Sequence, residues 1–317
     1  MNSQQPQRIG TRGSELALAQ ATETEALLRA AFPERGFERT IIRTTGDART
    51  DVSLSEVVKA EGTFDKGVFI KELELALDDG GIDIAVHSLK DLPTTLDPRF
   101  ALAAVLPRSG VRDLLVSLTP VSLLDLPPGS RVGTSSVRRA RQVLHLRPDL
   151  TVCDIRGNVP TRLAKLHAGD AFDAILLAEA GLIRLGMLPE TSADDSPEAI
   201  AGFPGLFATR LAEETFLPAA GQGAIGLEIR ADDAASRVFC ETIGDADTLL
   251  RVTAEREFLR LLNAGCHTPV GVSSLLADGL IHLKAIVFPE SDGSPRTGSA
   301  EAADPFEAAA LLYQSLS

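Results

Sequence analysis

The hydrophobic pattern of this chain changes period along its length. Short apolar runs that end in turn-forming residues predict strands, and longer stretches with apolar positions at helical spacing predict helices between them. Five predicted strands cover residues 37–43, 82–86, 150–155, 172–178 and 224–229. Two more are predicted to end near residues 10 and 132. The predicted helices cover residues 15–31, 67–77, 133–146 and 160–167. Strands alternating with helices indicate parallel α/β sheets, whose ligands bind beyond the carboxyl ends of the strands.

The last part of the chain has a different pattern. A helix at 253–262 is followed by two strands around the turn Asp278-Gly279 and by a final helix from about residue 304, which predicts a small α+β domain. We predict three domains: residues 1–106 with 217–231, residues 107–216, and residues 232–317. Because the chain would cross twice between the first two, we expect a hinged cleft. The polar stretch 48–66 is a candidate lid.

Composition narrows the classes of function. The chain of 317 residues has no Trp, one Tyr and a sequence pI near 4.9. Nucleic-acid binding is not expected, because it relies on basic faces and on aromatic side chains that stack with bases. Residues 1–8 are polar, and no apolar run reaches the roughly 18 residues that a membrane span requires. We therefore expect a cytoplasmic protein that binds no membrane.

The segment 131–165 is a basic island in an acidic protein. It carries a net charge of +6, whereas the whole chain carries −13. Four of its seven arginines occur in the turns 133–139 and 156–162, each after a predicted strand, and Thr11-Arg12-Gly13-Ser14 has a similar composition. Helix starts, hydroxyls and guanidinium groups together favour a ligand with several carboxylates or phosphates. Ordinary helix caps with solvated arginines are the alternative.

A second motif places a carboxylate near these cations. His87-Ser88-Leu89-Lys90-Asp91 follows the predicted strand 82–86. Nearby positive charge would keep Asp91 ionised, and it could then stabilise a cationic intermediate or bind a substrate N–H group. A structural salt bridge is the alternative.

Two further motifs are weaker. The segment 221–226 has the glycine spacing of a dinucleotide fingerprint, but it precedes a strand and opens no helix, so a nicotinamide cofactor is disfavoured. Cys266 lies in a loop after a helix and is the cysteine we expect to be reachable, although an unreactive thiol is the alternative. Cys153 and Cys240 fit core patterns. We predict no disulfide framework and no metal site.

Several motifs together resemble one family, porphobilinogen deaminase (hydroxymethylbilane synthase), over nearly the whole chain. These are Thr11-Arg12-Gly13-Ser14, Thr45-Gly46-Asp47, Lys71-Glu72-Leu73-Glu74, Asp83-Ile84-Ala85-Val86-His87-Ser88-Leu89-Lys90-Asp91-Leu92-Pro93, Gly133-Thr134-Ser135-Ser136-Val137-Arg138-Arg139, Arg156-Gly157-Asn158-Val159, Pro218-Ala219-Ala220-Gly221-Gln222-Gly223 and Gly265-Cys266. The resemblance implies two periplasmic-binding-protein-like α/β domains with a hinged cleft, followed by a small α+β domain.

The resemblance also implies a function. Enzymes of this family are transferases of heme and tetrapyrrole biosynthesis. They carry a covalent dipyrromethane cofactor on a cysteine, here Cys266, through a thioether. They join four porphobilinogen units to it with loss of ammonia, and hydrolysis then releases the linear tetrapyrrole hydroxymethylbilane. Each pyrrole carries an acetate and a propionate, so the growing polypyrrole chain accumulates the negative charge that the arginines would bind.

The resemblance assigns roles residue by residue. The catalytic group would be Asp91, with Lys90, Arg12 and Lys66. The cofactor would be bound by Cys266, Ser88, Lys90, Asp91, Thr134, Ser136, Arg138 and Arg139. Incoming substrate or the growing chain would contact Arg12, Ser14, Arg156 and Arg162. The loop 60–66 departs from the family pattern, so the role of Lys66 depends on an altered segment. We expect a monomer.

A protein of another class could share part of this pattern. A non-catalytic two-domain anion-binding protein of the periplasmic-receptor type would have the same hinged α/β domains. The predicted third domain with Cys266 favours the enzyme.

Overall fold

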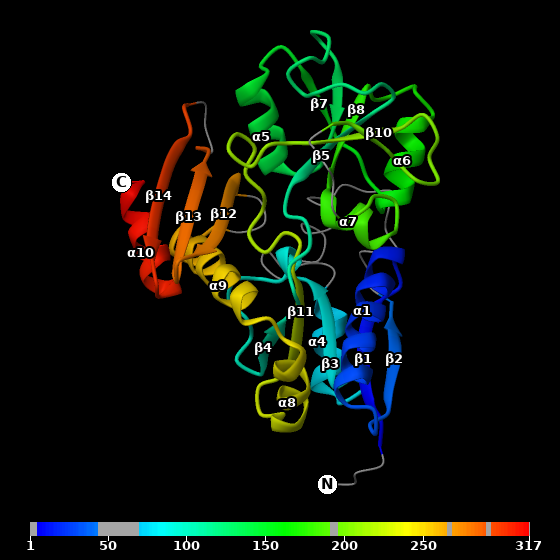
Figure 1. Ribbon diagram of the computed structural model, residues 1–317, viewed down its shortest axis with the longest axis vertical. Coiled ribbons are helices and arrows are strands. Elements are labelled where there is room, and N and C mark those ends of the chain that lie inside the picture. The colour runs from blue at the N-terminus through cyan, green and yellow to red at the C-terminus, as the bar shows by residue number, and fades with distance from the viewer. Residues whose placement is uncertain (1–4, 44–69, 191–195, 265–267, 290–292, 317) are drawn as a thin grey trace. The chain divides into compact units, whose positions relative to one another are not determined.

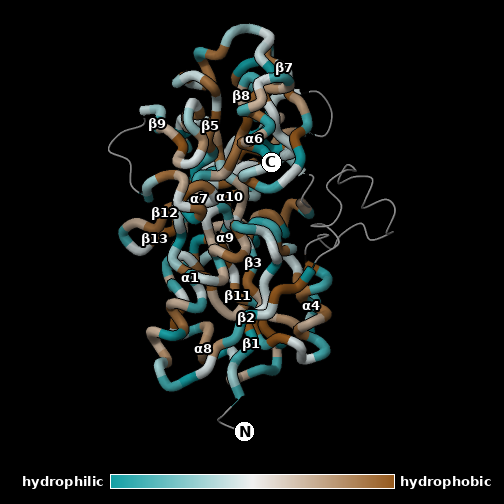
Figure 2. Tube along the Cα trace, turned by 90° about the vertical axis from the view of Figure 1, so that its right-hand side faces the viewer, coloured by the Kyte–Doolittle hydropathy of each residue, from teal (hydrophilic) through white to brown (hydrophobic). Residues whose placement is uncertain are grey.

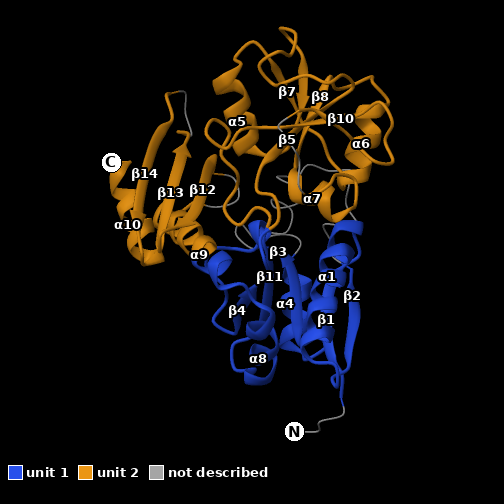
Figure 3. Cartoon of the chain, viewed as in Figure 1, with its two compact units in different colours: residues 1–108, 224–250 blue, residues 109–223, 251–317 orange. Residues whose placement is uncertain are grey.

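The computed structural model describes residues 5–43, 70–190, 196–264, 268–289 and 293–316. The chain separates into two compact units, residues 1–108 with 224–250 and residues 109–223 with 251–317 (Figure 3). The three-domain division stays a prediction. Residues 232–250, which it assigns to the third domain, belong to the first compact unit.

The first unit is an α/β sheet. Its elements are β1 (Gln7–Arg12), α1 (Glu15–Ala31), β2 (Phe37–Ile42), α4 (Lys71–Asp78), β3 (Ile84–Ser88), a 3₁₀ turn (Leu89–Asp91), β4 (Phe100–Val105), β11 (Ile225–Arg230) and α8 (Ala234–Ile243) (Figure 1). The strand order is β2–β1–β3–β11–β4. β1 is parallel to β2 and β3, whereas β11 is antiparallel to β3 and β4.

Helices cover both faces of this sheet. Ile84 of β3 packs in one hydrophobic cluster with Leu28 of α1 and Phe239 of α8. The next residue, Ala85, belongs to the opposite cluster with Leu73 of α4. Neighbouring residues of a strand point to opposite faces, so a strand covered on both sides is apolar throughout. This explains the continuous apolar run that predicted β3.

The second unit contains a six-stranded sheet. Its elements are β5 (Asp113–Ser117), β6 (Arg131–Gly133), α5 (Val137–Leu146), β7 (Thr151–Cys153), α6 (Val159–His167), β8 (Ala174–Ala178), α7 (Glu179–Arg184), β9 (Glu198–Ala199) and β10 (Phe207–Arg210). The strand order is β7–β6–β8–β5–β10–β9, and β6 is parallel to β7 and β8. One face packs against α6 and α7 through Leu163 and Leu182, and the other against α5 through Val143.

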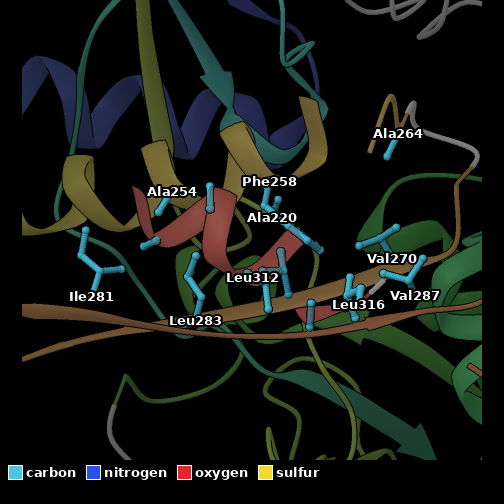
Figure 4. Close-up of a cluster of buried hydrophobic side chains, with 14 of the residues drawn as sticks. Ala220, Ala254, Phe258, Ala264, Val270, Ile281, Leu283, Val287, Leu312 and Leu316 are labelled. Atoms are coloured by element: carbon cyan, nitrogen blue, oxygen red, sulfur yellow. The ribbon is translucent and has the colours of Figure 1, made fainter. Parts of the chain in front are cut away.

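A three-stranded antiparallel sheet completes the second unit. It consists of β12 (Val270–Ala277), β13 (Leu280–Val287) and β14 (Arg296–Ala302), with the helices α9 (Ala246–Leu261) and α10 (Pro305–Ser315). Phe258 of α9, Leu283 of β13 and Leu312 of α10 share one core between the helices and the sheet (Figure 4). Figure 2 shows hydrophobic stretches along the chain separated by hydrophilic ones, as expected for elements with one buried face.

The structure confirms the predicted classes, α/β for the first two sheets and α+β for the last part. The predicted helix at 15–31 is α1, and Ser14 caps it by accepting the Ala17 N–H. The hairpin at Asp278-Gly279 is also confirmed, with positive φ angles of 51° and 75° at the two residues. The candidate lid at 48–66 lies outside the described residues.

The expectation of parallel sheets is confirmed for β1 with β2 and β3, and for β6 with β7 and β8, but it was wrong for the sheets as a whole, which are mixed. β5 is antiparallel to β8 and β10, as β11 is to its two neighbours. A crossover helix forces parallel pairing only between the two strands that it connects. β11 instead follows a glycine-containing turn, so no helix sets its direction. The prediction also missed β4, β5, β9, β10 and β14.

Candidate functional site

The carboxyl ends of β1 and β3 lie side by side at the same end of the first sheet. The two strands are adjacent and parallel, with Ile9 opposite Ile84 and Gly10 opposite Ala85. Arg12 ends β1 and Ser88 ends β3. The structure therefore brings together, in the first unit, two of the motifs that the sequence singled out.

The turn after β3 is held by one buried side chain. Leu89 is only 1% exposed, and its N–H donates to the Ala224 carbonyl at 3.0 Å. A Cβ on Gly226 would lie 3.0 Å from the Leu89 Cδ1 atom, so glycine leaves the space that Leu89 fills. Lys90 and Asp91, which follow in the same 3₁₀ turn, are exposed. The turn thus presents an ammonium and a carboxylate from a fixed backbone.

A buried amide orients Ser88. The Gln20 side chain from α1 donates to Ser88 Oγ at 2.9 Å, and its Oε1 lies 3.1 Å from the same hydroxyl. Gln20 is 3% exposed. Sequence reasoning missed this residue, although a glutamine among the buried positions Ala17, Ala21 and Thr24 of one helix face was the available signal.

His87, next to Ser88, interacts with a residue of the neighbouring strand β11. Its Nε2 lies 2.9 Å from Oε2 of Glu228 in β11, and both residues are buried. The pair links β3 to β11 next to the turn. Neither side chain reaches the surface on which Lys90 and Asp91 are exposed.

In the second unit, the hydroxyls of the turn after β6 cap α5. The Thr134 N–H donates to the Cys153 carbonyl at 2.8 Å, and Thr134 Oγ1 accepts the Ser136 N–H at 3.2 Å. Ser136 is the N-cap and accepts the Arg139 N–H at 3.4 Å. The ordinary capping role, one of the two alternatives, is therefore present. It does not exclude a ligand at the same helix start.

A simple surface role would require Arg138 and Arg139 to be solvated, and they are not. Each residue is 6% exposed, and both guanidinium groups bind the fully buried carboxylate of Asp113. Arg138 Nη1 donates to Oδ2 at 2.6 Å, and Arg139 donates to Oδ1 through Nε at 2.9 Å and Nη2 at 2.7 Å. Sequence reasoning missed Asp113, because nothing near it in sequence indicates its partners.

Charge explains why the buried Asp113 stays ionised. Burial alone would raise the pKa of Asp113, but the charges and hydrogen bonds of Arg138 and Arg139 outweigh it and hold that pKa well below its usual range. The group of three side chains therefore keeps one net positive charge.

The third arginine motif follows β7. Gly157 has a φ of 115°, which favours glycine, and Asn158 caps α6 by accepting the Thr161 N–H at 2.9 Å. Arg162 Nε donates to the Gly157 carbonyl at 2.7 Å. Arg156 and Arg162 are half-buried. Strand order places this turn beside the turn after β6, because β6 and β7 are adjacent and parallel.

Part of the basic island is neutralised by acids. Besides the pair bound to Asp113, Arg131 lies 3.4 Å from Asp173, and Arg147 lies 2.6 Å from Asp149. Asp113 and Asp173 come from outside the basic segment. Its local charge is therefore smaller than the sequence count of +6.

The remaining candidate residues behave as follows. Lys66 and Cys266 lie outside the described residues. Cys240 is a core thiol, and burial raises its pKa to about 12; Cys153 is half-buried. The glycines of 221–226 lead into the strand β11 and open no helix, so the context that a dinucleotide fingerprint needs is absent.

Two kinds of feature are absent from the described residues. No group of three or more His, Cys, Asp or Glu side chains is arranged to hold a metal ion. In the part of the chain that the structure describes, no helix has the length and apolar character needed to cross a membrane.

Comparison with known proteins identifies the family. Residues 7–237 match the model "Porphobilinogen deaminase, dipyromethane cofactor binding domain", and residues 249–317 match "Porphobilinogen deaminase, C-terminal domain". The chain belongs to the porphobilinogen deaminase family. The porphobilinogen deaminase of Nitrobacter hamburgensis is 47% identical over 307 residues, 96% of this chain and 89% of the relative. That of Syntrophobacter fumaroxidans is 42% identical over 301 residues, 95% of this chain and 90% of the relative.

This membership confirms the resemblance seen in the sequence and the dipyrromethane cofactor that it implied. All of the candidate residues except Cys266 lie within the range of the cofactor-binding model, whereas Cys266 lies in that of the C-terminal model. The porphobilinogen deaminase of Sphingopyxis alaskensis is 44% identical and covers 98% of this chain and 93% of its own length.

Solved structures with a similar chain path are distant. The BenM effector-binding domain with benzoate has a TM-score of 0.42 at 16% identity, and it covers 75% of this chain and 90% of its own. A Salmonella typhimurium periplasmic binding protein with high arginine specificity has a TM-score of 0.42 at 10% identity, covering 77% of this chain and 94% of its own. Similarity at this level says nothing about the chemistry of this chain.

Proposed function

We propose that this chain is a hydroxymethylbilane synthase, a transferase that condenses four porphobilinogen molecules in turn and releases the linear tetrapyrrole by hydrolysis. The observation that carries the proposal is family membership over almost the whole chain, with both family models matched. The exposed Lys90 and Asp91 on a rigid turn supply the charged groups that such a reaction needs.

The chemistry of the side chains fits a dipyrromethane that carries several carboxylates. Thr134 and Ser136 stand at the start of α5, and Arg138 and Arg139 follow in its first turn and would bind cofactor carboxylates. In the first unit, Ser88 and Lys90 supply a hydroxyl and an ammonium at the end of β3. Charge-assisted hydrogen bonds to carboxylates contribute about 1.5–3 kcal/mol each.

Cys266 is the residue that we propose as the covalent anchor, through a thioether. When bound, the dipyrromethane supplies the free pyrrole carbon to which the first substrate unit is joined. The support for Cys266 is its match to the cysteine of the family motif, since Cys153 is half-buried and Cys240 is a core residue.

Asp91 would act on the substrate. Its carboxylate would accept the pyrrole N–H of porphobilinogen and stabilise the positive charge that develops as the carbon–nitrogen bond breaks and ammonia leaves. Lys90 and Arg12 would assist by binding substrate or cofactor carboxylates. Ser14, Arg156 and Arg162 would bind those of the incoming unit or the growing chain, and Lys66 would belong to the catalytic group.

The test is the intact mass of the purified protein. We expect a mass above that of the bare polypeptide by one dipyrromethane, and a colour reaction with an aldehyde reagent for pyrroles. Cys266→Ala should have the bare mass, while Cys153→Ala should keep the adduct as the matched control. A wild-type protein with the bare mass and no turnover of porphobilinogen would contradict the proposal and favour a non-catalytic anion-binding protein.

We also propose that the enzyme is a cytoplasmic monomer. The net charge of −13 disfavours self-association, and the free thiols Cys153 and Cys240 agree with a reducing compartment. Light scattering would measure the mass in solution, and cell fractionation would measure the location.

A further inference from the structure

Four hydrogen-bond donors converge on one carboxylate in the second unit. Asp113, at the start of β5, has no exposed surface. Its Oδ2 accepts from Arg138, and its Oδ1 accepts two bonds from Arg139 and one from the Gln222 amide at 3.1 Å. All four donors come from other elements, so Asp113 sets where three side chains lie relative to the sheet.

Arg138 also helps to hold the segment 217–223, together with Gln142 of the same helix. Arg138 Nη1 donates to the Leu217 carbonyl at 2.6 Å, and Gln142 binds both the N–H and the carbonyl of Leu217, at 2.8 and 2.9 Å. On its other side, the Gly221 N–H donates to Glu255 of α9 at 2.7 Å. The segment is therefore fixed from α5 and from α9 together.

We propose that Asp113 is a positioning residue for cofactor binding, which aligns the guanidinium groups of Arg138 and Arg139 and leaves them one net positive charge. The inference rests on the proposed function, in which these arginines bind cofactor carboxylates. Asp113 itself is too deeply buried to touch the ligand. It acts through the arginines.

The geometry supports a positioning role over a purely stabilising one. A buried ion pair costs so much desolvation that apolar residues of similar volume often stabilise a fold equally well. Two adjacent arginines without a counter-charge would repel each other and turn apart. With Asp113 between them, both guanidinium groups are held in fixed directions, as binding of a directional ligand requires.

The variant Asp113→Asn tests this, because it keeps the shape of the side chain and removes its charge. We expect the folded variant to carry at least about tenfold less covalent cofactor than the wild type, the scale seen when a residue that orients a ligand group is removed. Intact mass gives the loaded fraction, measured on protein purified well below its unfolding temperature. Asp113→Glu, which restores the charge, should recover part of the loading.

The matched control is Glu179→Gln. Glu179 is 4% exposed, and its carboxylate binds Arg210 and Arg112 of the same unit, not the arginine pair of α5. It should lower the unfolding temperature as Asp113→Asn does, yet keep full cofactor loading. Equal loading in Asp113→Asn and Glu179→Gln, with the cofactor present in the wild type, would overturn the positioning role and leave the proposed function intact.

A milder variant covers the case in which Asp113→Asn does not fold. Gln222→Met removes one neutral donor to Asp113 and keeps both arginine contacts. We expect it to fold and to reduce loading by a smaller factor than Asp113→Asn. Unchanged loading in folded Gln222→Met, if Asp113→Asn cannot be purified, would also overturn the proposal. A wild type without cofactor would instead refute the proposed function.

Discussion

Replacing Leu89 by alanine should separate the stability of the first unit from its activity. Leu89 is the buried residue of the turn that carries Lys90 and Asp91, and its side chain is 1% exposed. The substitution removes no charge and no polar group. Any loss of activity beyond unfolding must therefore arise from the position of the turn.

The expected cost follows from the packing. Leu-to-Ala substitutions at buried sites destabilise by about 2–5 kcal/mol, and more when neighbours cannot fill the cavity. One neighbour here is Gly226, which has no side chain to move into the space. We therefore expect Leu89→Ala to lower the free energy of unfolding by about 3–5 kcal/mol, which lowers the unfolding midpoint by about 6–20 °C. The free energy of unfolding of native domains is about 5–15 kcal/mol, so much of the protein should remain folded at low temperature.

The activity effect should be larger than the folded fraction explains. A displacement of about 1 Å of a group that contacts the reacting atoms can reduce the rate by about 10²-fold. The assay is porphobilinogen consumption per folded, cofactor-loaded molecule, at a temperature where circular dichroism shows the variant folded. Leu28→Ala is the matched control, because Leu28 is a fully buried leucine of the same unit on α1, outside the turn.

Two results would refute this reasoning. A wild-type kcat in folded Leu89→Ala would mean that the leucine does not position Asp91. An equal loss of kcat in Leu28→Ala would mean that loss of stability alone explains the effect.

Three further predictions concern single residues. Asp91→Asn should keep the covalent cofactor but lower kcat by about 10²–10⁴-fold; a wild-type rate in a steady-state assay would remove Asp91 from its role. Burial alone would raise the pKa of Asp83, but hydrogen bonds from Arg8 and Arg230 hold that pKa below its ordinary value of 3.8. Its contribution to stability is thus complete above about pH 4 and is lost as the pH falls through the folded pKa. Thermal midpoints between pH 5 and pH 3 should fall less in Asp83→Asn than in the wild type, and equal slopes would contradict this. Gly157→Ala should lower the unfolding midpoint, because a Cβ would lie 2.6 Å from a Thr161 methyl group at a φ of 115°; an unchanged midpoint would show that the turn relaxes.

Local patterns predicted most of the elements that carry the site. α1 with its Ser14 cap, β3, and the helix starts of α5 and α6 all depend on spacing and capping residues within a few positions of one another. The strands β4, β5 and β10 were missed, because they lie among irregular segments with no helical partner next to them in sequence. The predicted parallel direction was wrong for β11, which no helix precedes in the sequence.

Family motifs predicted which residues carry chemistry, but not how each side chain is held. Ser88 was identified from its motif, whereas its partner Gln20 is 68 positions away in sequence. Arg138 and Arg139 were expected to be free for a ligand. Their partner Asp113 lies 25 and 26 positions away, on another strand.

The amino-acid sequence alone therefore determined the family, the helices and strands with a clear local pattern, and the turns at which Arg12, Lys90 and Asp91 occur, because these depend on neighbouring residues. Only the tertiary structure decided which charges remain available. Asp113 and Asp173 neutralise arginines of the basic segment from elsewhere in the chain. The physical reason is that the attraction between charges depends on distance in space and on burial, and the spacing of residues along the chain specifies neither.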